Sequence, residues 1–169
     1  SQDDLEKKLY LTRRRIENKI KALNINDFYI CSLSTETIVY KGMFLAEQLS
    51  EFYTDLLDPD FKSKFAIYHQ RYSTNTFPTW SLAQPFRVLA HNGEINTLKG
   101  NINWMSAHEP RITHPFFNER INDLKPILDS DASDSASLDG AFELLVQTDR
   151  DMPMAKSMII PEAWSNRSD

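Results

Sequence analysis

Apolar residues recur every three to four positions in four stretches of the chain, which is the spacing of a helix with one buried face. The predicted helices are residues 4–23, 45–57, 97–108 and 136–147, followed by a short helix between Pro153 and Pro161. Ser133 or Asp134 is placed to cap the fourth helix. Asn96 or Thr97 is placed to cap the third.

The pattern also assigns outer and inner sides to two of these helices. Arg13, Arg14 and Arg15 lie in succession inside the first helix. With Glu6 and Glu17 nearby, they are interpreted as a solvated charged face. The expected apolar side of the fourth helix is Leu138, Ala141, Phe142, Leu144 and Leu145.

Shorter runs of β-branched and aromatic residues predict strands between the helices. They are residues 28–33, 37–40, 65–73 and 86–91, the first two joined as a hairpin through residues 34–36. Residues 109–132 contain three prolines and are expected to be mostly irregular. Strands and helices are interspersed without a regular βαβ order, so the predicted class is an α+β layered domain over residues 1–169.

Composition supports a globular chain rather than a nucleic-acid binder. Of the 169 residues, 41% are hydrophobic, which is enough apolar material for a packed core. The formal net charge is −5, whereas a nucleic-acid binder carries a basic face. No apolar run approaches the length that spans a membrane.

The start of the chain and its cysteine content indicate a reducing compartment. The first residues are acidic and polar, unlike a secretory signal or a transit peptide. Residue 1 is Ser rather than Met, so the chain is expected to start inside a larger protein. The single cysteine excludes an internal disulfide. The expected location is the cytoplasm, or the plastid stroma if the source is a photosynthetic eukaryote.

The densest group of candidate binding residues surrounds Arg71. Its planar guanidinium can hold a carboxylate through two parallel hydrogen bonds. The hydroxyl groups of Ser73, Thr74 and Thr76 add donors beside it. The alternative is a structural arginine paired with a neighbouring Asp or Glu. The stretch is therefore a candidate carboxylate site.

Asn92 and Gly93 are a candidate oxyanion hole. A side-chain amide next to an exposed backbone amide can stabilise developing negative charge on oxygen. Gly93 also lets another atom approach the backbone closely. Asn-Gly is at the same time the strongest short signal for a plain β-hairpin. The two interpretations are compatible, because a tight turn exposes an amide.

Asp134 lies at the start of the fourth predicted helix, where it could cap the helix or accept an ammonium group. Local sequence favours the cap. Asp129, Asp131 and Asp139 are close in sequence, and the group lacks the ligand spacing of a calcium loop. No metal site is predicted, because the four histidines lack zinc-site spacing and one cysteine cannot complete a zinc cluster. Cys31 lies inside an apolar run and is interpreted as an inert thiol, so no nucleophile is identified.

Two motifs and several shorter matches carry a family resemblance along almost the whole chain. The motifs are His-Gln-Arg-Tyr-Ser-Thr-Asn-Thr-Phe-Pro-Thr-Trp at residues 69–80 and Ala-His-Asn-Gly-Glu-Ile-Asn-Thr at residues 90–97. The supporting segments are residues 9–15, 28–33, 39–43, 83–86, 100–105, 133–139 and 160–164. In this order they resemble the large subunit of glutamate synthases, within its N-terminal class II glutamine amidotransferase (glutaminase) domain.

This resemblance implies the N-terminal-nucleophile hydrolase fold, a four-layer αββα sandwich that would be incomplete here. It implies that an N-terminal cysteine attacks the side-chain amide of L-glutamine and releases ammonia. In the implied site, Arg71 clamps the α-carboxylate of glutamine and Asp134 holds its α-ammonium group. The implied oxyanion hole and pocket lining are Asn92, Gly93, Thr74 and Thr76.

The family's cysteine does not stand at residue 1, so the chain is expected to be an internal fragment without glutaminase activity of its own. For the full protein, the resemblance implies amination of 2-oxoglutarate to glutamate with FMN and an iron–sulfur cluster, neither bound by this segment. Ferredoxin or a nicotinamide-dependent partner subunit would supply electrons. Two alternatives remain: the glutaminase domain of another class II amidotransferase, and a non-catalytic module that binds an amino acid.

Overall fold

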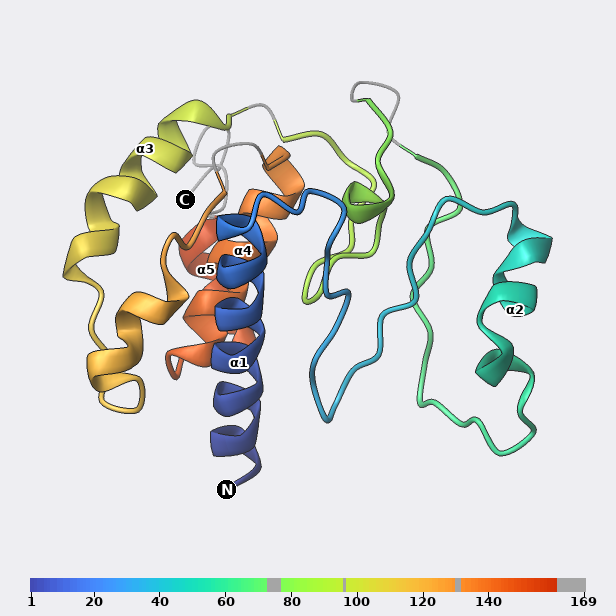
Figure 1. Cartoon of the computed structure of the whole chain (residues 1–169). Coiled ribbons are helices and arrows are strands. Elements are labelled where there is room, and N and C mark those ends of the chain that lie inside the picture. The colour runs from blue at the N-terminus through green and yellow to red at the C-terminus, as the bar shows by residue number, and fades with distance from the viewer. Residues whose placement is uncertain (73–76, 96, 130–131, 161–169) are drawn as a thin grey trace, which may run out of the picture.

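The computed structural model describes residues 1–72, 77–95, 97–129 and 132–160, a part of the chain that is helical or irregular (Figure 1). Its α-helices are α1 (Gln2–Ala22), α2 (Leu49–Phe52), α3 (Lys99–His108), α4 (Asp134–Gln147) and α5 (Met152–Ile159). Short 3-10 helices occupy Ala46–Gln48, Thr54–Leu57, Trp80–Leu82, Glu109–Arg111 and Asn118–Leu124. In Figure 1, α1, α4 and α5 lie together, whereas α2 lies at the opposite side of the molecule.

The predicted helices at residues 4–23 and 136–147 are confirmed as α1 and α4. The Ser1 hydroxyl accepts from the Asp4 backbone N–H at 3.1 Å, and the Ser1 amine donates to the Asp4 carboxylate at 3.1 Å, so the two residues form a capping box. The short helix expected after Pro153 is confirmed as α5. Pro161, its expected end, lies outside the described residues.

Two other helix predictions need correction. The helix expected at residues 45–57 is broken into α2 and the 3-10 helices on either side of it. The helix expected at residues 97–108 begins at Lys99, with Leu98 rather than Thr97 at its N-cap and no side-chain cap. Asn96 lies outside the described residues. Boundaries differ because propensity is a weak signal that local packing readily shifts.

The strand predictions are wrong for the residues that the structure describes. The ranges that contain no strand are residues 28–33, 37–40, 65–72 and 86–91, and residue 73 lies outside the description. The chain does bend at Thr35 and Glu36, where the Ser34 hydroxyl accepts from the backbone N–H of Glu36 at 3.0 Å. A strand requires backbone hydrogen bonds to an aligned neighbour. An apolar pattern cannot supply that neighbour, so the described part realises only the helical half of the predicted α+β class.

The apolar core lies where α1 meets α4 and the Asn118–Leu124 helix. Its buried members are Tyr10, Leu11, Phe117, Leu124, Ile127 and Leu144. The rings of Tyr10 and Phe117 meet edge to face, with centroids 6.1 Å apart. That geometry is favourable for aromatic pairs, so it helps to define how α1 seats on residues 117–127.

A buried ion network crosses this core, and it corrects the interpretation of the arginine run as solvated. Arg13 is 1% exposed. Its guanidinium donates to Glu17 at 2.8 Å and to Glu143 on α4 at 2.5 Å. Burial acts to lower the pKa of Arg13, but the two carboxylates outweigh burial and raise it. Arg14 is largely buried as well, and only Arg15 of the three is exposed.

The inner side of α4 is also more polar than predicted. Its buried residues are Ser137, Asp139, Glu143 and Leu144. Of the expected apolar side, only Leu144 is buried, whereas the other four residues are partly exposed. The apolar pattern did not predict this buried side, because a charged residue can be buried when a partner of opposite charge is buried beside it.

Several large apolar side chains remain exposed in the described structure. Tyr68 is 82% exposed and Phe77 is 87% exposed, and Phe65, Ile67 and Trp104 are exposed too. Three of these residues lie in the segment that was predicted to be a strand. Clustered exposed apolar side chains mark surfaces that contact another part of a protein or a partner.

Replacing Arg13 by Met should lower the free energy of unfolding by about 3 kcal/mol, because Glu143 would keep a buried charge without a partner. The measurement is urea unfolding of the chain followed by circular dichroism. The matched control is Arg15→Met, which removes an exposed ion pair and should cost about 0–1 kcal/mol. Equal losses for the two variants would contradict the buried-network assignment.

Candidate functional site

A hydrogen bond joins the Arg71 stretch to Asn92. His69, two residues before Arg71, places its Nε2 atom 2.8 Å from Asn92 Oδ1. A carboxamide oxygen only accepts hydrogen bonds, so His69 Nε2 carries the proton in this contact. The Asn92 Nδ2 group is then left to donate in another direction. An oxyanion donor requires an N–H group that is free in this way.

A second chain of hydrogen bonds joins the Asn92 segment to Asp134. His91 Nε2 lies 2.8 Å from the Ser135 hydroxyl. The same hydroxyl donates to Asp134 Oδ1 at 3.1 Å. Because a carboxylate only accepts, the Ser135 hydroxyl must receive its own hydrogen bond from His91 Nε2–H. The three segments predicted to form the site are therefore connected through two histidines that the sequence analysis did not select.

Asp134 does not cap α4, which corrects the interpretation favoured by local sequence. Ser133 takes that role, its hydroxyl accepting from the Ala136 backbone N–H at 3.1 Å. Asp134 is the first helical residue, and its Oδ1 atom also accepts from the Ser135 backbone N–H at 2.6 Å. Its Oδ2 atom has no partner within the described part of the chain. That oxygen is available to accept a hydrogen bond from an ammonium group.

Arg71 is exposed, and no carboxylate among the described residues pairs with it. The alternative of a structural ion pair is therefore not observed in this part of the chain. The guanidinium keeps the free donors that a bidentate carboxylate contact needs. Thr74 and Thr76, the other predicted pocket residues, lie outside the described residues, as does Ser73.

Gly93 is exposed beside Asn92, but the two residues do not form the predicted tight hairpin turn. Such a turn needs positive φ angles, and Gly93 does not have one. A Cβ atom added at Gly93 would meet no other atom within 4 Å. The backbone at Gly93 therefore faces open space that a ligand can enter.

Sequence reasoning missed the buried charges that hold the segment before Asn92. Asp139 on α4 accepts hydrogen bonds from the backbone N–H groups of Arg87, Val88 and Leu89 at 3.4, 2.9 and 3.0 Å. The Arg87 guanidinium donates to Glu17 on α1 at 2.5 Å. The available signal was spacing: Arg13 and Glu17, and Asp139 and Glu143, are each four apart and so share a helix face.

Lys41 is a further buried charge that the sequence analysis did not select. It is 4% exposed, and its Nζ atom donates to the Ser81 carbonyl at 2.9 Å. The same atom stands over the rings of Tyr29 and Phe86, 4.6 and 4.4 Å from their centroids. Burial lowers the pKa of Lys41 to about 8. Nearby Cys31 is partly buried, and burial raises its pKa, which fits the predicted inert thiol.

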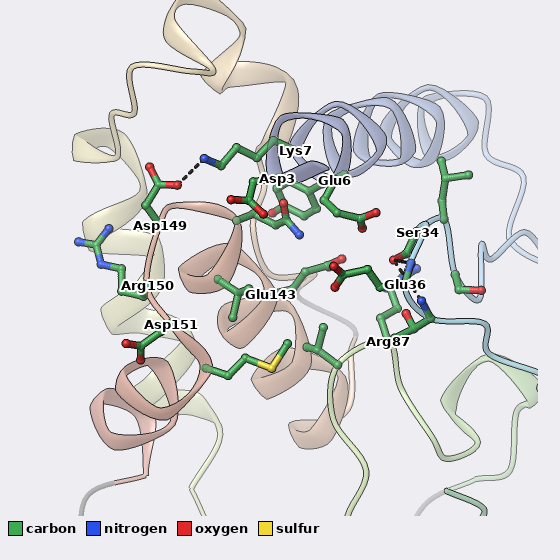
Figure 2. Close-up of a pocket in the computed structure, with 18 residues that line it drawn as sticks. Asp3, Glu6, Lys7, Ser34, Glu36, Arg87, Glu143, Asp149, Arg150 and Asp151 are labelled. Carbon is green, nitrogen blue, oxygen red and sulfur yellow. Dashed lines mark hydrogen bonds and ion pairs between the residues drawn. The ribbon is translucent and has the colours of Figure 1, made fainter. Parts of the chain in front are cut away.

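A cavity of about 510 Å³ lies elsewhere, between α1, residues 32–37 and the junction of α4 with α5. Figure 2 shows Lys7 and Asp149 paired on one side of it and Arg87 and Glu36 on the other. None of Arg71, Asn92, Gly93 and Asp134 lines it. We therefore take the residues joined through His69 and His91 as the candidate site, rather than this cavity. Arg87 and Glu143 of the ion network line the cavity.

The described residues contain neither a metal site nor a membrane-crossing helix. Across the described ranges, no group of three or more His, Cys, Asp or Glu side chains is arranged to hold a metal ion. Within the same ranges, no helix has the length and apolar character needed to cross a bilayer.

Comparison with known proteins decides the family. A family profile described as "Glutamine amidotransferases class-II" matches residues 1–169. The chain belongs to the class-II glutamine amidotransferases. Among curated members, the glutamate synthase [NADPH] large chain of Azospirillum brasilense is 63% identical over 166 residues, 98% of this chain and 11% of that protein.

Two further relatives are named ferredoxin-dependent glutamate synthases. The ferredoxin-dependent glutamate synthase of Pyropia yezoensis is 50% identical over 175 residues, covering 100% of this chain and 11% of that protein. The chloroplastic ferredoxin-dependent glutamate synthase of Oryza sativa subsp. japonica is 49% identical over 165 residues, 97% of this chain and 10% of that protein. The chain thus spans about a tenth of the length of these relatives.

Substitutions at the start of α4 should distinguish the helix cap, Ser133, from the neighbouring carboxylate of Asp134. Ser133→Ala removes the helix cap and should lower the free energy of unfolding by about 1 kcal/mol. Asp134→Asn removes only a charge near the helix N-terminus and should cost about 0.5 kcal/mol. Both are measured by urea unfolding of the chain. If Asp134→Asn lowered the free energy of unfolding more than Ser133→Ala does, Asp134 rather than Ser133 would be the helix cap.

Proposed function

We propose that residues 1–169 are part of the glutaminase domain of a glutamate synthase, which hydrolyses L-glutamine to glutamate and ammonia. The observation that carries this proposal is the pair of hydrogen-bond links from His69 to Asn92 and from His91 through Ser135 to Asp134. These links connect the three segments that carry a cation, an anion and two amide donors. A glutamine molecule needs that set, because its head is a zwitterion and its side-chain amide becomes an oxyanion during attack.

Each group is proposed to hold one part of glutamine. Arg71 binds the α-carboxylate through its free guanidinium, and Asp134 accepts the α-ammonium group through Oδ2. Asn92 Nδ2 and the Gly93 backbone N–H donate to the oxyanion that forms when the side-chain carbonyl is attacked. Thr74 and Thr76 line the same pocket. Support for the oxyanion role comes from the His69 contact, which occupies the Asn92 oxygen and leaves the nitrogen free.

The nucleophile is proposed to be a cysteine outside residues 1–169, as the family resemblance implies. Its α-amine takes the thiol proton and the thiolate adds to the glutamine side-chain carbonyl. The C–N bond then breaks, and the leaving nitrogen receives that proton and departs as ammonia. Water then hydrolyses the thioester, which releases glutamate and restores the thiol. Cys31 does not suit this role, because it lies inside the chain and burial disfavours its thiolate.

The fold is proposed to be the αββα sandwich of the N-terminal-nucleophile hydrolases, completed by other segments of the full protein. Support comes from the exposed apolar side chains of Phe65, Ile67 and Tyr68, which lie in a segment with strand-like sequence. A neighbouring strand would give this segment its backbone partners, and a helical layer would cover its apolar side chains.

For the full protein, we propose that the released ammonia aminates 2-oxoglutarate to glutamate. FMN and an iron–sulfur cluster would serve that reaction, with sites outside this chain. The names of the relatives support NADPH, through a partner subunit, or ferredoxin as electron source. They also support glutamate synthase over other class II amidotransferases. Because some relatives are named chloroplastic, we propose the plastid stroma as well as the cytoplasm as a location.

In the full-length enzyme, Arg71→Ala should raise the KM for glutamine roughly 100-fold, since it removes charge-assisted hydrogen bonds to the α-carboxylate. Glutamate production is measured with glutamine and then with ammonium as nitrogen source. The ammonium-dependent rate should not change, which shows that the rest of the enzyme is intact. Arg120→Ala, at another exposed arginine, is the matched control. An unchanged KM for glutamine would remove Arg71 from the site.

The polypeptide of residues 1–169 should release no ammonia from glutamine above the rate without protein, because it lacks the proposed nucleophile. A glutamate-dehydrogenase-coupled assay measures the release. The full-length enzyme is the positive control. Measurable turnover by the short polypeptide, abolished by Cys31→Ala, would contradict the assignment of the nucleophile.

A further inference from the structure

We propose that Asp139 is a positioning residue for the oxyanion hole. It holds the backbone of residues 87–89 on α4 and so places Asn92 and Gly93 relative to Asp134. The inference rests on the proposed glutaminase function and names a residue that does not touch glutamine in that proposal.

The contact between Asp139 and residues 87–89 resembles a site in which backbone N–H groups bind an anion. Three successive backbone N–H groups point at one carboxylate, with the two shorter bonds, from Val88 and Leu89, both ending on Oδ1. The Phe86 backbone N–H donates to the Leu89 carbonyl at 2.8 Å and closes the turn. Successive N–H groups arranged in this way favour a bound anion. Here the anion is a side chain of the protein itself.

Asp139 is 1% exposed, so its carboxylate depends on these partners rather than on water. Burial raises the pKa of Asp139 to about 6, which means that the backbone donors and Arg87 do not fully offset the lost hydration. Losing the carboxylate would leave three partly buried N–H groups without this acceptor. The turn would then shift toward other partners, and the residues that follow it would shift as well.

The same helix holds the segment at a second point. Ser135 and Asp139 are four residues apart, so they lie on one face of α4 about 6 Å apart along its axis. Ser135 contacts His91, and Asp139 contacts residues 87–89. Asp134, the proposed ammonium acceptor, begins this helix. One rigid element therefore sets the separation between the ammonium site and the oxyanion donors, and Asp139 supplies the more buried of its two attachments.

The test uses the full-length enzyme and separates positioning from general stability. Asp139→Ala should lower kcat for glutamine about tenfold or more, because displaced donors stabilise the oxyanion poorly. The KM for glutamine should stay within about twofold, since Arg71 and Asp134 still bind the substrate head. Ammonium-dependent glutamate production should not change.

Asp139→Asn is the conservative variant. Its amide oxygen can keep both short hydrogen bonds at Oδ1, so kcat should return to within about threefold of the unaltered enzyme. Glu143→Gln is the matched control, because it alters a buried carboxylate on the same side of α4 whose partner is Arg13. It should lower the melting temperature while kcat for glutamine stays unchanged.

Two outcomes would overturn the inference. One is an unchanged kcat in Asp139→Ala, and the other is a parallel loss of kcat, KM and ammonium-dependent rate that Asp139→Asn does not restore. If Asp139→Ala does not fold, Asp139→Ser replaces it, since its shorter hydroxyl side chain cannot reach all three N–H groups, and the same kcat loss is expected. Asn92→Ala tests the proposed function separately: if that variant keeps full kcat, the oxyanion assignment itself fails, whatever Asp139 does.

Discussion

The pairing of Arg13 with Glu17 and Glu143 is the contact on which the rest of the described structure depends. It joins α1 to α4 inside the core, and Glu17 extends it to Arg87 in the segment that leads to Asn92. A buried ion pair is a poor source of net stability, yet removing one partner is costly because the other charge stays buried. In the observed arrangement, the buried charges of α1 and α4 and the charge of Arg87 compensate one another.

The α4 helix also carries contacts that lie outside that network. Glu143 pairs with Arg13 and so joins α4 to α1. Asp139, one helical turn before Glu143, holds residues 87–89, and Ser135, one turn before Asp139, contacts His91. The helix thus carries a polar stripe with a spacing of four residues, and the site lies at its N-terminal end. Because Ser133 caps the helix, Asp134 keeps an oxygen for another partner. A helix suits this purpose, since its fixed rise holds attached groups at set distances.

Two of the longer helices were predictable, whereas the strands and the buried charges were not. Helix periodicity is local, so α1 and α4 followed from the spacing of their apolar residues, and Ser133 was one of two candidate caps for α4. Strand formation at residues 28–33 or 65–72 depends on a partner distant in sequence, and no strand is seen there in the described structure. The solvated interpretation of Arg13 failed for the same reason: its decisive partner, Glu143, lies 130 residues away.

By itself, the sequence determined the helices α1, α4 and α5 and the family to which the chain belongs, and it selected the stretches around Arg71, Asn92 and Asp134 as candidates. These rest on the residue types and spacings that a single chain displays. Only the tertiary structure decided that two histidines connect those stretches, that Ser133 rather than Asp134 caps α4, and that Asp139 is buried against residues 87–89. Hydrogen bonds and burial between distant residues arise from chain packing, and no local pattern encodes which partner a polar group will meet.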